Sequence, residues 1–185
     1  LNDIDEAKEW LENSTTRMYD GIAKSNFQQE IFECYFDLIA FGTACLMIEE
    51  DQEDTLLFSA RHIKEIYIQE NKKGFVDTVY RKFKMPSQAV IDKFGIDNVS
   101  KDTVTTFKKS PFEEIVLVHV ARPRIDYDPK KKDKQNMPVQ SIYFEFETGH
   151  IISIGGFNEM PYVIPRYLKA STEVYGRSPG MNALP

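Results

Sequence analysis

The chain has 185 residues, of which 42% are hydrophobic and 28% charged, and its formal net charge is −6. These proportions are typical of a globular protein with a substantial core. The excess of acid argues against the broad cationic face of a free-standing nucleic-acid-binding protein. No run of 18 apolar residues occurs and the acidic start "LNDIDEAKEW" is unlike a signal peptide, so neither a membrane span nor secretion is predicted.

The first third of the chain predicts two helices. Apolar residues recur at three- and four-residue steps from Ile4 to Ile22, with Asn2 or Asp3 placed to cap the start. A second helix follows "SNF" at residues 25–27 and ends at Gly42. It is apolar on two faces, one marked by Phe27, Ile31, Tyr35 and Leu38 and the other by Phe32, Phe36 and Ile39. Such a helix is usually buried between layers.

From Thr43 the pattern changes to short runs rich in β-formers. "TACLMIEE", "TLLFSA" and "IKEIYIQ" predict strands, the first two joined by the acidic turn "EEDQED" at residues 49–54. "ENKKGF" predicts a hairpin turn in which Gly74 takes a positive φ. The strand at 76–85 follows. Neither of its faces is purely polar, which favours a strand covered on both sides.

The second half predicts a helix between strands and then a hairpin. Residues 86–95 predict a compact helix that starts at a proline and ends at Gly95, and residues 96–112 fit a short helix or a loop. Residues 112–124 predict a strand. The polar stretch 126–138 predicts a mobile loop, and residues 139–157 predict a second hairpin.

No motif for catalysis, cofactor binding or metal binding is present. Cys34 and Cys45 lie in apolar stretches and are predicted to be reduced core thiols. His62, His119 and His150 belong to no catalytic or metal-binding pattern, although a Cys–His hydrolase stays an alternative because such partners can be distant in sequence. The acids at 49–54 lack the glycine and the distal glutamate of a calcium loop and favour a solvated turn. We expect no catalytic residue, no metal and no cofactor.

The stretch "STEVYGRSPG" at residues 171–180 is the most unusual local feature. Its glycines allow backbone angles closed to other residues, and Pro179 biases Ser178 away from helix. It predicts a shaped turn that leads into a further element. Since the chain opens on Leu1, we expect it to be an excised middle portion of a longer protein.

The order of the motifs resembles that of a known family. "SNF", "FDLIAFGTACLMIEE", "GFVDTVYRKFKM", "VLVHVARPR" and the closing block from "GGFNEMPY" to "SPGMNALP" are similar in sequence and spacing to the head-to-tail connecting, or portal, protein of short-tailed, T7-like bacteriophages. Tyr167 stands where a tryptophan is more usual. The closing block supplies the candidate joint or interface residues, which are Pro161, Tyr162, Arg166, Tyr175, Gly176, Arg177, Ser178 and Pro179.

The resemblance implies a structural subunit and no enzyme. Its ring, typically of twelve copies, would sit at one vertex of the capsid in the virion, after assembly in the host bacterial cytoplasm. A separate terminase motor would package DNA through the ring, without sequence-specific binding, and the DNA would be ejected the same way. The tail would attach below the ring. The turn at 171–180 would feed a stem helix.

We therefore expect an α+β fold, with N-terminal helices packed on a mixed, mostly antiparallel sheet and a small C-terminal β unit. Residues 1–122 are expected to be wing-like, residues 123–138 a mobile charged loop, and residues 139–185 a clip-like hairpin and turn leading to an omitted stem helix. The alternative is another ring or adaptor component of a phage tail, without a stem.

Overall fold

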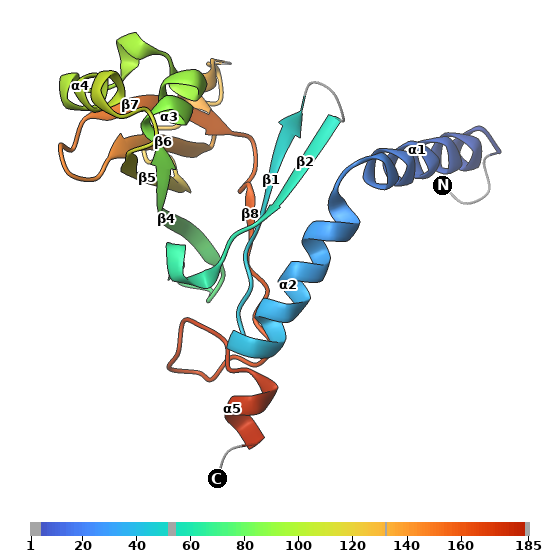
Figure 1. The fold of residues 1–185 in the computed structure, drawn as a ribbon. Helices are drawn as coiled ribbons and strands as arrows, with labels where there is room; N and C mark the ends of the chain where they lie inside the picture. Colours follow the sequence, from blue (N-terminus) through green and yellow to red (C-terminus); the bar gives the residue numbers. More distant parts are fainter. Residues whose placement is uncertain (1–4, 52–54, 132, 184–185) are drawn as a thin grey trace. The chain divides into compact units, whose positions relative to one another are not determined.

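The computed structural model describes residues 5–51, 55–131 and 133–183, and it divides the chain into two compact units (Figure 1). The first unit contains residues 1–61, 162–169 and 176–185, and the second contains residues 62–161 and 170–175. Helices and antiparallel sheets are both present, so the predicted α+β class is confirmed.

The first unit joins helices to a three-stranded sheet. Its helices are α1 (Asp5–Lys24), α2 (Phe27–Phe41) and the short α5 (Pro179–Ala183). The sheet has the order β2-β1-β8, from β1 (Leu46–Asp51), β2 (Thr55–Ala60) and β8 (Tyr162–Val163). Both pairings are antiparallel. The expected cap at Asn2 or Asp3 and part of the expected acidic turn, residues 52–54, lie outside the described residues.

Local chemistry explains how α2 begins, ends and attaches to the sheet. Its end at Gly42 is confirmed, since this glycine has φ 76° and its N–H donates to the Leu38 carbonyl at 2.9 Å. At the other end, the Asn26 side chain accepts from the Phe58 N–H at 2.9 Å and donates to the Phe58 carbonyl at 2.8 Å. Asn26 thus replaces a neighbouring strand at the free edge of β2.

The second unit is built on a five-stranded antiparallel sheet with the order β3-β4-β5-β6-β7. Its strands are β3 (Ile66–Glu70), β4 (Val76–Pro86), β5 (Glu114–Pro123), β6 (Val139–Glu145) and β7 (Ile151–Phe157). Its helices are α3 (Ser87–Phe94) and α4 (Lys101–Lys109), with 3₁₀ turns at Ile63–Glu65, Ile96–Asn98 and Lys134–Asn136. The ambiguous stretch 96–112 therefore contains a helix, which the Ser100 hydroxyl caps by accepting from the Thr103 N–H.

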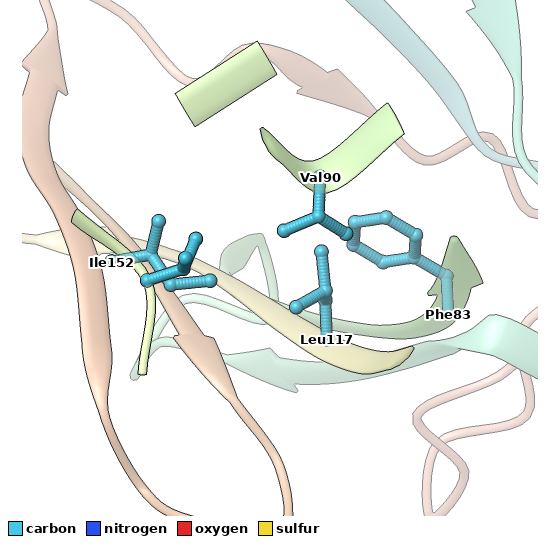
Figure 2. Close-up of a cluster of buried hydrophobic side chains, with 5 residues drawn as sticks. Phe83, Val90, Leu117 and Ile152 are labelled. Atoms are coloured by element: carbon cyan, nitrogen blue, oxygen red, sulfur yellow. The ribbon is translucent and has the colours of Figure 1, made fainter. Parts of the chain in front are cut away.

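One face of this sheet carries the main core. Phe83 of β4 and Leu117 of β5 are cross-strand partners on that face, and Val90 of α3 packs against them with Ile152 of β7 (Figure 2). Leu117 and Val90 are fully buried. The alternation of β4 thus has a clear inner side, because its even-numbered neighbours Tyr80 and Lys82 are exposed on the other face.

The hairpin at 139–157 differs from its predicted place. The sequence predicts a small C-terminal β unit within residues 139–185, but β6 pairs with β5 from Leu117↔Glu145 to Pro123↔Val139 and extends the main sheet. The expected mixed sheet is also absent among the described strands, whose pairings are all antiparallel. Hairpin turns account for three of these pairings, β1–β2, β3–β4 and β6–β7, because a tight turn joins antiparallel neighbours. The glycines of the β3–β4 and β6–β7 turns, Gly74 and Gly149, have φ of 79° and 68°.

The polar stretch 126–138 contains a hydrogen-bonded hub. The Asn136 side chain is buried, accepts from the Asp128 N–H at 3.1 Å, and donates to the Asp128 and Lys131 carbonyls. Sequence reasoning did not foresee this anchor, since a lone asparagine in a charged run carries no apolar pattern. The mobility of the loop stays a prediction.

Candidate structural joint

The closing motif meets the end of α2 inside the first unit. The Gly176 N–H donates to the Thr43 hydroxyl at 2.8 Å, and Thr43 is only 1% exposed. Residues 42–44, which follow α2, also bind residues 165–167. The Ala44 N–H donates to the Pro165 carbonyl at 3.1 Å, and the Tyr167 N–H donates to the Gly42 carbonyl at 2.9 Å. We call residues 42–44, 165–168 and 176–178 the joint.

Two glycines make the joint possible. A Cβ atom at Gly176 would overlap the Gly42 carbonyl oxygen and come within 3.0 Å of Cβ of Arg166. A Cβ atom at Gly42 would overlap the backbone of residues 176–178. The two backbones therefore lie in direct contact, and each position excludes every side chain.

The reason for glycine at 176 differs from the conformational one. From the sequence, backbone freedom is the expected reason for glycine at 176, but the positive-φ glycines of the described chain are Gly42, Gly74, Gly95 and Gly149. At 176 the constraint is space and not the sign of φ. Sequence reasoning missed Gly42 and Thr43 as members of this site, because 133 residues separate Thr43 from Gly176. The only feature of the sequence that pointed to this part of the joint was the glycine that ends the second helix, Gly42.

Ser178 and Pro179 start the last helix. Ser178 is 2% exposed, and its hydroxyl accepts from the Met181 N–H at 3.1 Å, as an N-cap side chain does. Pro179 is the first helical residue, where its missing N–H has no consequence. Arg177 is exposed, and its backbone N–H donates to the Leu168 carbonyl at 2.7 Å. Pairing of its side chain with Glu159 or Glu173 stays a prediction.

The remaining candidates lie where the chain passes between the units. Pro161 and Tyr162 are buried, and Tyr162 pairs with Met47 in the three-stranded sheet. Arg166 bridges to Thr43 and so belongs to the joint. Tyr175 belongs to the second unit, where its hydroxyl accepts from the Ile68 N–H at 3.3 Å and donates to the Ile66 carbonyl at 3.1 Å. The structure therefore brings Arg166, Gly176, Arg177 and Ser178 together and gives Tyr175 a separate role at the edge of β3.

The two cysteines, which the hydrolase alternative would need as a nucleophile, lie in the folded interior. Cys34 and Cys45 are free and buried, as predicted. Burial, followed by the nearby charges of Asp37, Glu30 and Glu33, raises the pKa of the Cys34 thiol to about 11, which disfavours the reactive thiolate. In the described residues no three His, Cys, Asp or Glu side chains are grouped so that they could hold a metal.

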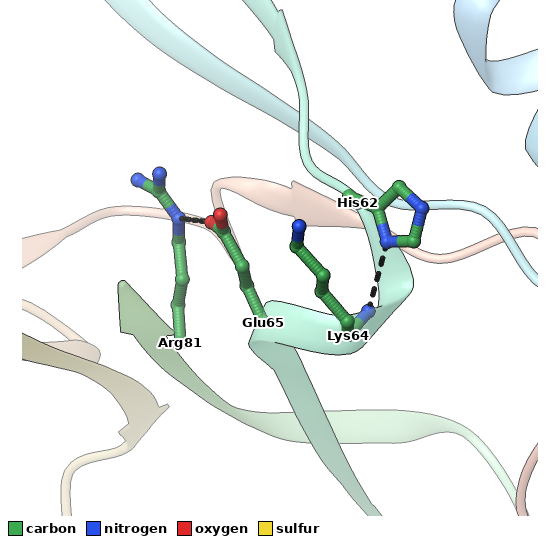
Figure 3. A network of polar contacts seen from close by, with 4 residues as sticks. All are labelled: His62, Lys64, Glu65 and Arg81. Carbon is green, nitrogen blue, oxygen red and sulfur yellow. Dashed lines mark hydrogen bonds and ion pairs between the residues drawn. The ribbon is translucent and has the colours of Figure 1, made fainter. Parts of the chain in front are cut away.

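The three histidines make structural contacts in the second unit. His62 accepts the Lys64 N–H at 3.2 Å beside the Arg81–Glu65 ion pair, whose Nε and Oε2 atoms are 3.1 Å apart (Figure 3). His119 is fully buried, bonds the Ser141 hydroxyl at 2.9 Å, and stacks on Tyr143 at 4.0 Å between ring centroids. His150 contacts the Asn98 carbonyl at 3.0 Å.

Together these features define a structural module whose distinguishing site is a packed backbone joint. The chain belongs to the bacteriophage head to tail connecting protein family, whose profile matches residues 1–185. It is 33% identical over 188 residues to the portal protein of Salmonella phage epsilon15 and 31% identical over 190 residues to the probable portal protein of Bordetella phage BPP-1. Each alignment covers 100% of this chain and 34% of the relative, so the chain spans about a third of their length.

None of the described helices is both long enough and apolar enough to cross a bilayer.

Proposed function

We propose that this chain is the wing and clip-side part of a portal subunit, a structural component of the virion that forms a ring at one capsid vertex. The observation that carries the proposal is the similarity to two phage portal proteins along the whole chain. In this role a terminase motor drives DNA through the ring during packaging, the DNA leaves by the same channel on ejection, and the tail binds the ring. The closing motif supports placement in the short-tailed, T7-like group.

Chemistry and charge support a passive conduit. The raised pKa of Cys34 disfavours a thiolate nucleophile at that position, and the structural contacts of His62 and His119 give neither ring a catalytic partner among those contacts, which argues against a Cys–His hydrolase. A net charge of −6 suits a channel through which DNA slides, because each tight phosphate contact would require counterion redistribution. The joint sets the direction in which the chain leaves the first unit through α5, which suits a connection to a stem helix.

The natural full-length protein is expected to form closed rings, because a head-to-tail contact that closes gives cyclic symmetry. Negative-stain electron microscopy of the purified protein, with mass photometry for the copy number, tests this. Monomers or two-fold dimers at high concentration would reject the portal role. Rings without a stem would favour the alternative, a tail adaptor.

Arg177→Ala is expected to reduce ring assembly or tail attachment while leaving the melting temperature nearly unchanged. Alanine keeps the bond from the Arg177 backbone N–H to the Leu168 carbonyl, and it removes an exposed guanidinium that is able to form a bidentate pair with a carboxylate of an adjacent subunit. Arg177→Lys is the matched control, since it keeps the charge and loses the bidentate fork. Normal rings and normal genome packaging with Arg177→Ala would show that the Arg177 side chain is not needed for contacts between subunits or with the tail.

A further inference from the structure

Helix α2 has one covered side and one bare side. Its covered side packs on the three-stranded sheet through Phe27, Ile31 and Leu38. On its bare side Phe32, Tyr35, Phe36 and Ile39 are between 54% and 66% exposed, and the rings of Phe32 and Phe36 meet edge to face at 5.6 Å. The sequence predicts a helix buried between two layers, and the described part of the first unit supplies one of them.

Acidic residues flank the bare side along one edge. All charged residues of α2 are acids, namely Glu30, Glu33 and Asp37. Glu30 is used within the unit, where its carboxylate accepts from the Ala60 N–H at 2.6 Å. Glu33 lies with Phe32 and Phe36 around a shallow hollow on the helix. The bare side of α2 thus combines an i, i+4, i+7 apolar stripe with negative charge, as helices that dock into apolar surfaces do.

The second unit has a face of complementary character. Opposite the core face, one cross-strand row runs over all five strands, from Tyr67 through Tyr80, Val120 and Ile142 to Ile154. Tyr67, Tyr80 and Ile154 are 56%, 37% and 45% exposed, whereas Val120 at the centre of the row is buried by its neighbours. We call this side of the sheet the open face.

The open face is basic at its margins. By alternation along β4 and β5 it also carries Lys82, Lys84, Arg122 and Glu114. Lys84 pairs with Glu114 at 2.9 Å, Lys82 lies over the Phe146 ring at 3.3 Å, and Arg122 bonds the neutral Gln140 at 3.0 Å. In these contacts Lys82 and Arg122 meet a neutral side chain and not an acid.

The same asymmetry holds for the whole units. The first unit has 7 Lys and Arg against 14 Asp and Glu, a net charge of −7, whereas the second has 16 against 15, a net charge of +1. A ring needs two different surfaces on each subunit that are complementary to each other. A strongly acidic first unit and a nearly balanced second unit, whose open face carries Lys82 and Arg122, provide such a pair.

We propose that the bare side of α2 in one copy docks on the open face of the second unit in a neighbouring copy. The inference rests on the proposed ring and names its subunit contact. The apolar stripe of the helix covers the Tyr67–Ile154 row, which gives the five-stranded sheet a helix layer on its second face. Glu33 and Asp37 meet the cations at the margins, and this complementarity sets orientation and register.

Charge-reversal variants of the natural full-length protein test the contact. Glu33→Lys with Asp37→Lys reverses the helix, and Lys82→Glu with Arg122→Glu reverses the open face. Each pair alone is expected to raise the protein concentration needed for half assembly by about tenfold or more, since like charges then face each other. An equimolar mixture of the two variants is expected to assemble again, because each reversed face then meets its complement on the other variant.

The controls separate this contact from folding and from the portal role itself. Lys108→Glu with Lys109→Glu makes the same change in net charge on α4, away from the open face, and should leave assembly unchanged. Melting temperatures show that each variant folds. Unchanged rings from both reversed variants would overturn the contact and leave the portal role standing, whereas a wild-type protein without rings would overturn the portal role.

Two further outcomes would also overturn the contact between copies. If the quadruple variant assembles but the mixture does not, the helix docks on the open face of its own chain. If both variants form normal rings that fail to bind capsid or tail, another protein covers α2.

Discussion

Gly176→Ala is expected to lower the free energy of unfolding of the first unit by about 3 kcal/mol, and Gly176→Val by more. The added Cβ overlaps the Gly42 carbonyl oxygen, which is backbone and cannot turn away as a flexible side chain could. Relief requires separating residues 176–178 from residues 42–44, which breaks the 2.8 Å bond between the Gly176 N–H and the Thr43 hydroxyl. Chemical denaturation of the full-length protein, followed by hydrogen exchange at the joint, measures the loss.

Gly180→Ala is the matched control, because it makes the same substitution four residues further along. A Cβ there would meet only the Ser178 hydroxyl, at 3.6 Å, and the residue lies in α5. Alanine in a helix is favoured over glycine by roughly 1 kcal/mol, so this variant should be as stable as the wild type or slightly more so. Equal losses at 176 and 180 would show that the motif does not depend on the close backbone contact.

Glu145→Gln is expected to destabilise the second unit at neutral pH by about 2 kcal/mol. The Glu145 carboxylate is 2% exposed and accepts from the Ser100 N–H at 2.9 Å and from the Thr148 hydroxyl at 2.8 Å. It thereby ties the cap of α4 to the end of β6. An amide of the same shape has one acceptor oxygen and no charge, so it keeps the bond from the Ser100 N–H only by turning its N–H₂ group toward the Thr148 hydroxyl, which must then accept instead of donate.

The pH dependence of the free energy of unfolding tests the role of Glu145 in a second way. Burial alone would raise the pKa of Glu145, but the hydrogen bonds from Ser100, Thr148 and Thr103 outweigh it and hold the pKa below its ordinary value of 4.5. A lowered pKa contributes stability above pH 4.5, and this contribution is lost as the pH falls through the value in the folded protein. The difference between wild type and Glu145→Gln should therefore shrink between pH 5 and the acid limit of folding.

Glu147→Gln tests whether the effect belongs to the buried carboxylate. Glu147 is exposed two residues away, and its substitution should leave the stability at neutral pH unchanged. A flat difference between wild type and Glu145→Gln below pH 5 would show that Glu145 is not ionised in the folded protein.

Local signals in the sequence determined most of the elements. The helix stop at Gly42, the turns at Gly74 and Gly149, and the helix from Pro86 to Gly95 depend on the backbone preferences of single residues, which act wherever the rest of the chain lies. The order of the motifs led to the family, and the comparisons confirm that family. The finer assignments to a T7-like group, to wing and clip, and to an interface at residues 161–179 stay predictions.

Only the tertiary structure decided which distant residues meet. Gly176 contacts Gly42 and Thr43, which lie 133 or more residues earlier in the chain. A backbone contact of this kind leaves no periodic pattern in the sequence. The β6–β7 hairpin joined the main sheet because β5 offered it an unpaired edge, which composition does not reveal. Periodicity showed that α2 has two apolar faces, but burial within the chain depends on what packs nearby. The structure covered one of those faces and left Phe32, Phe36 and Ile39 exposed.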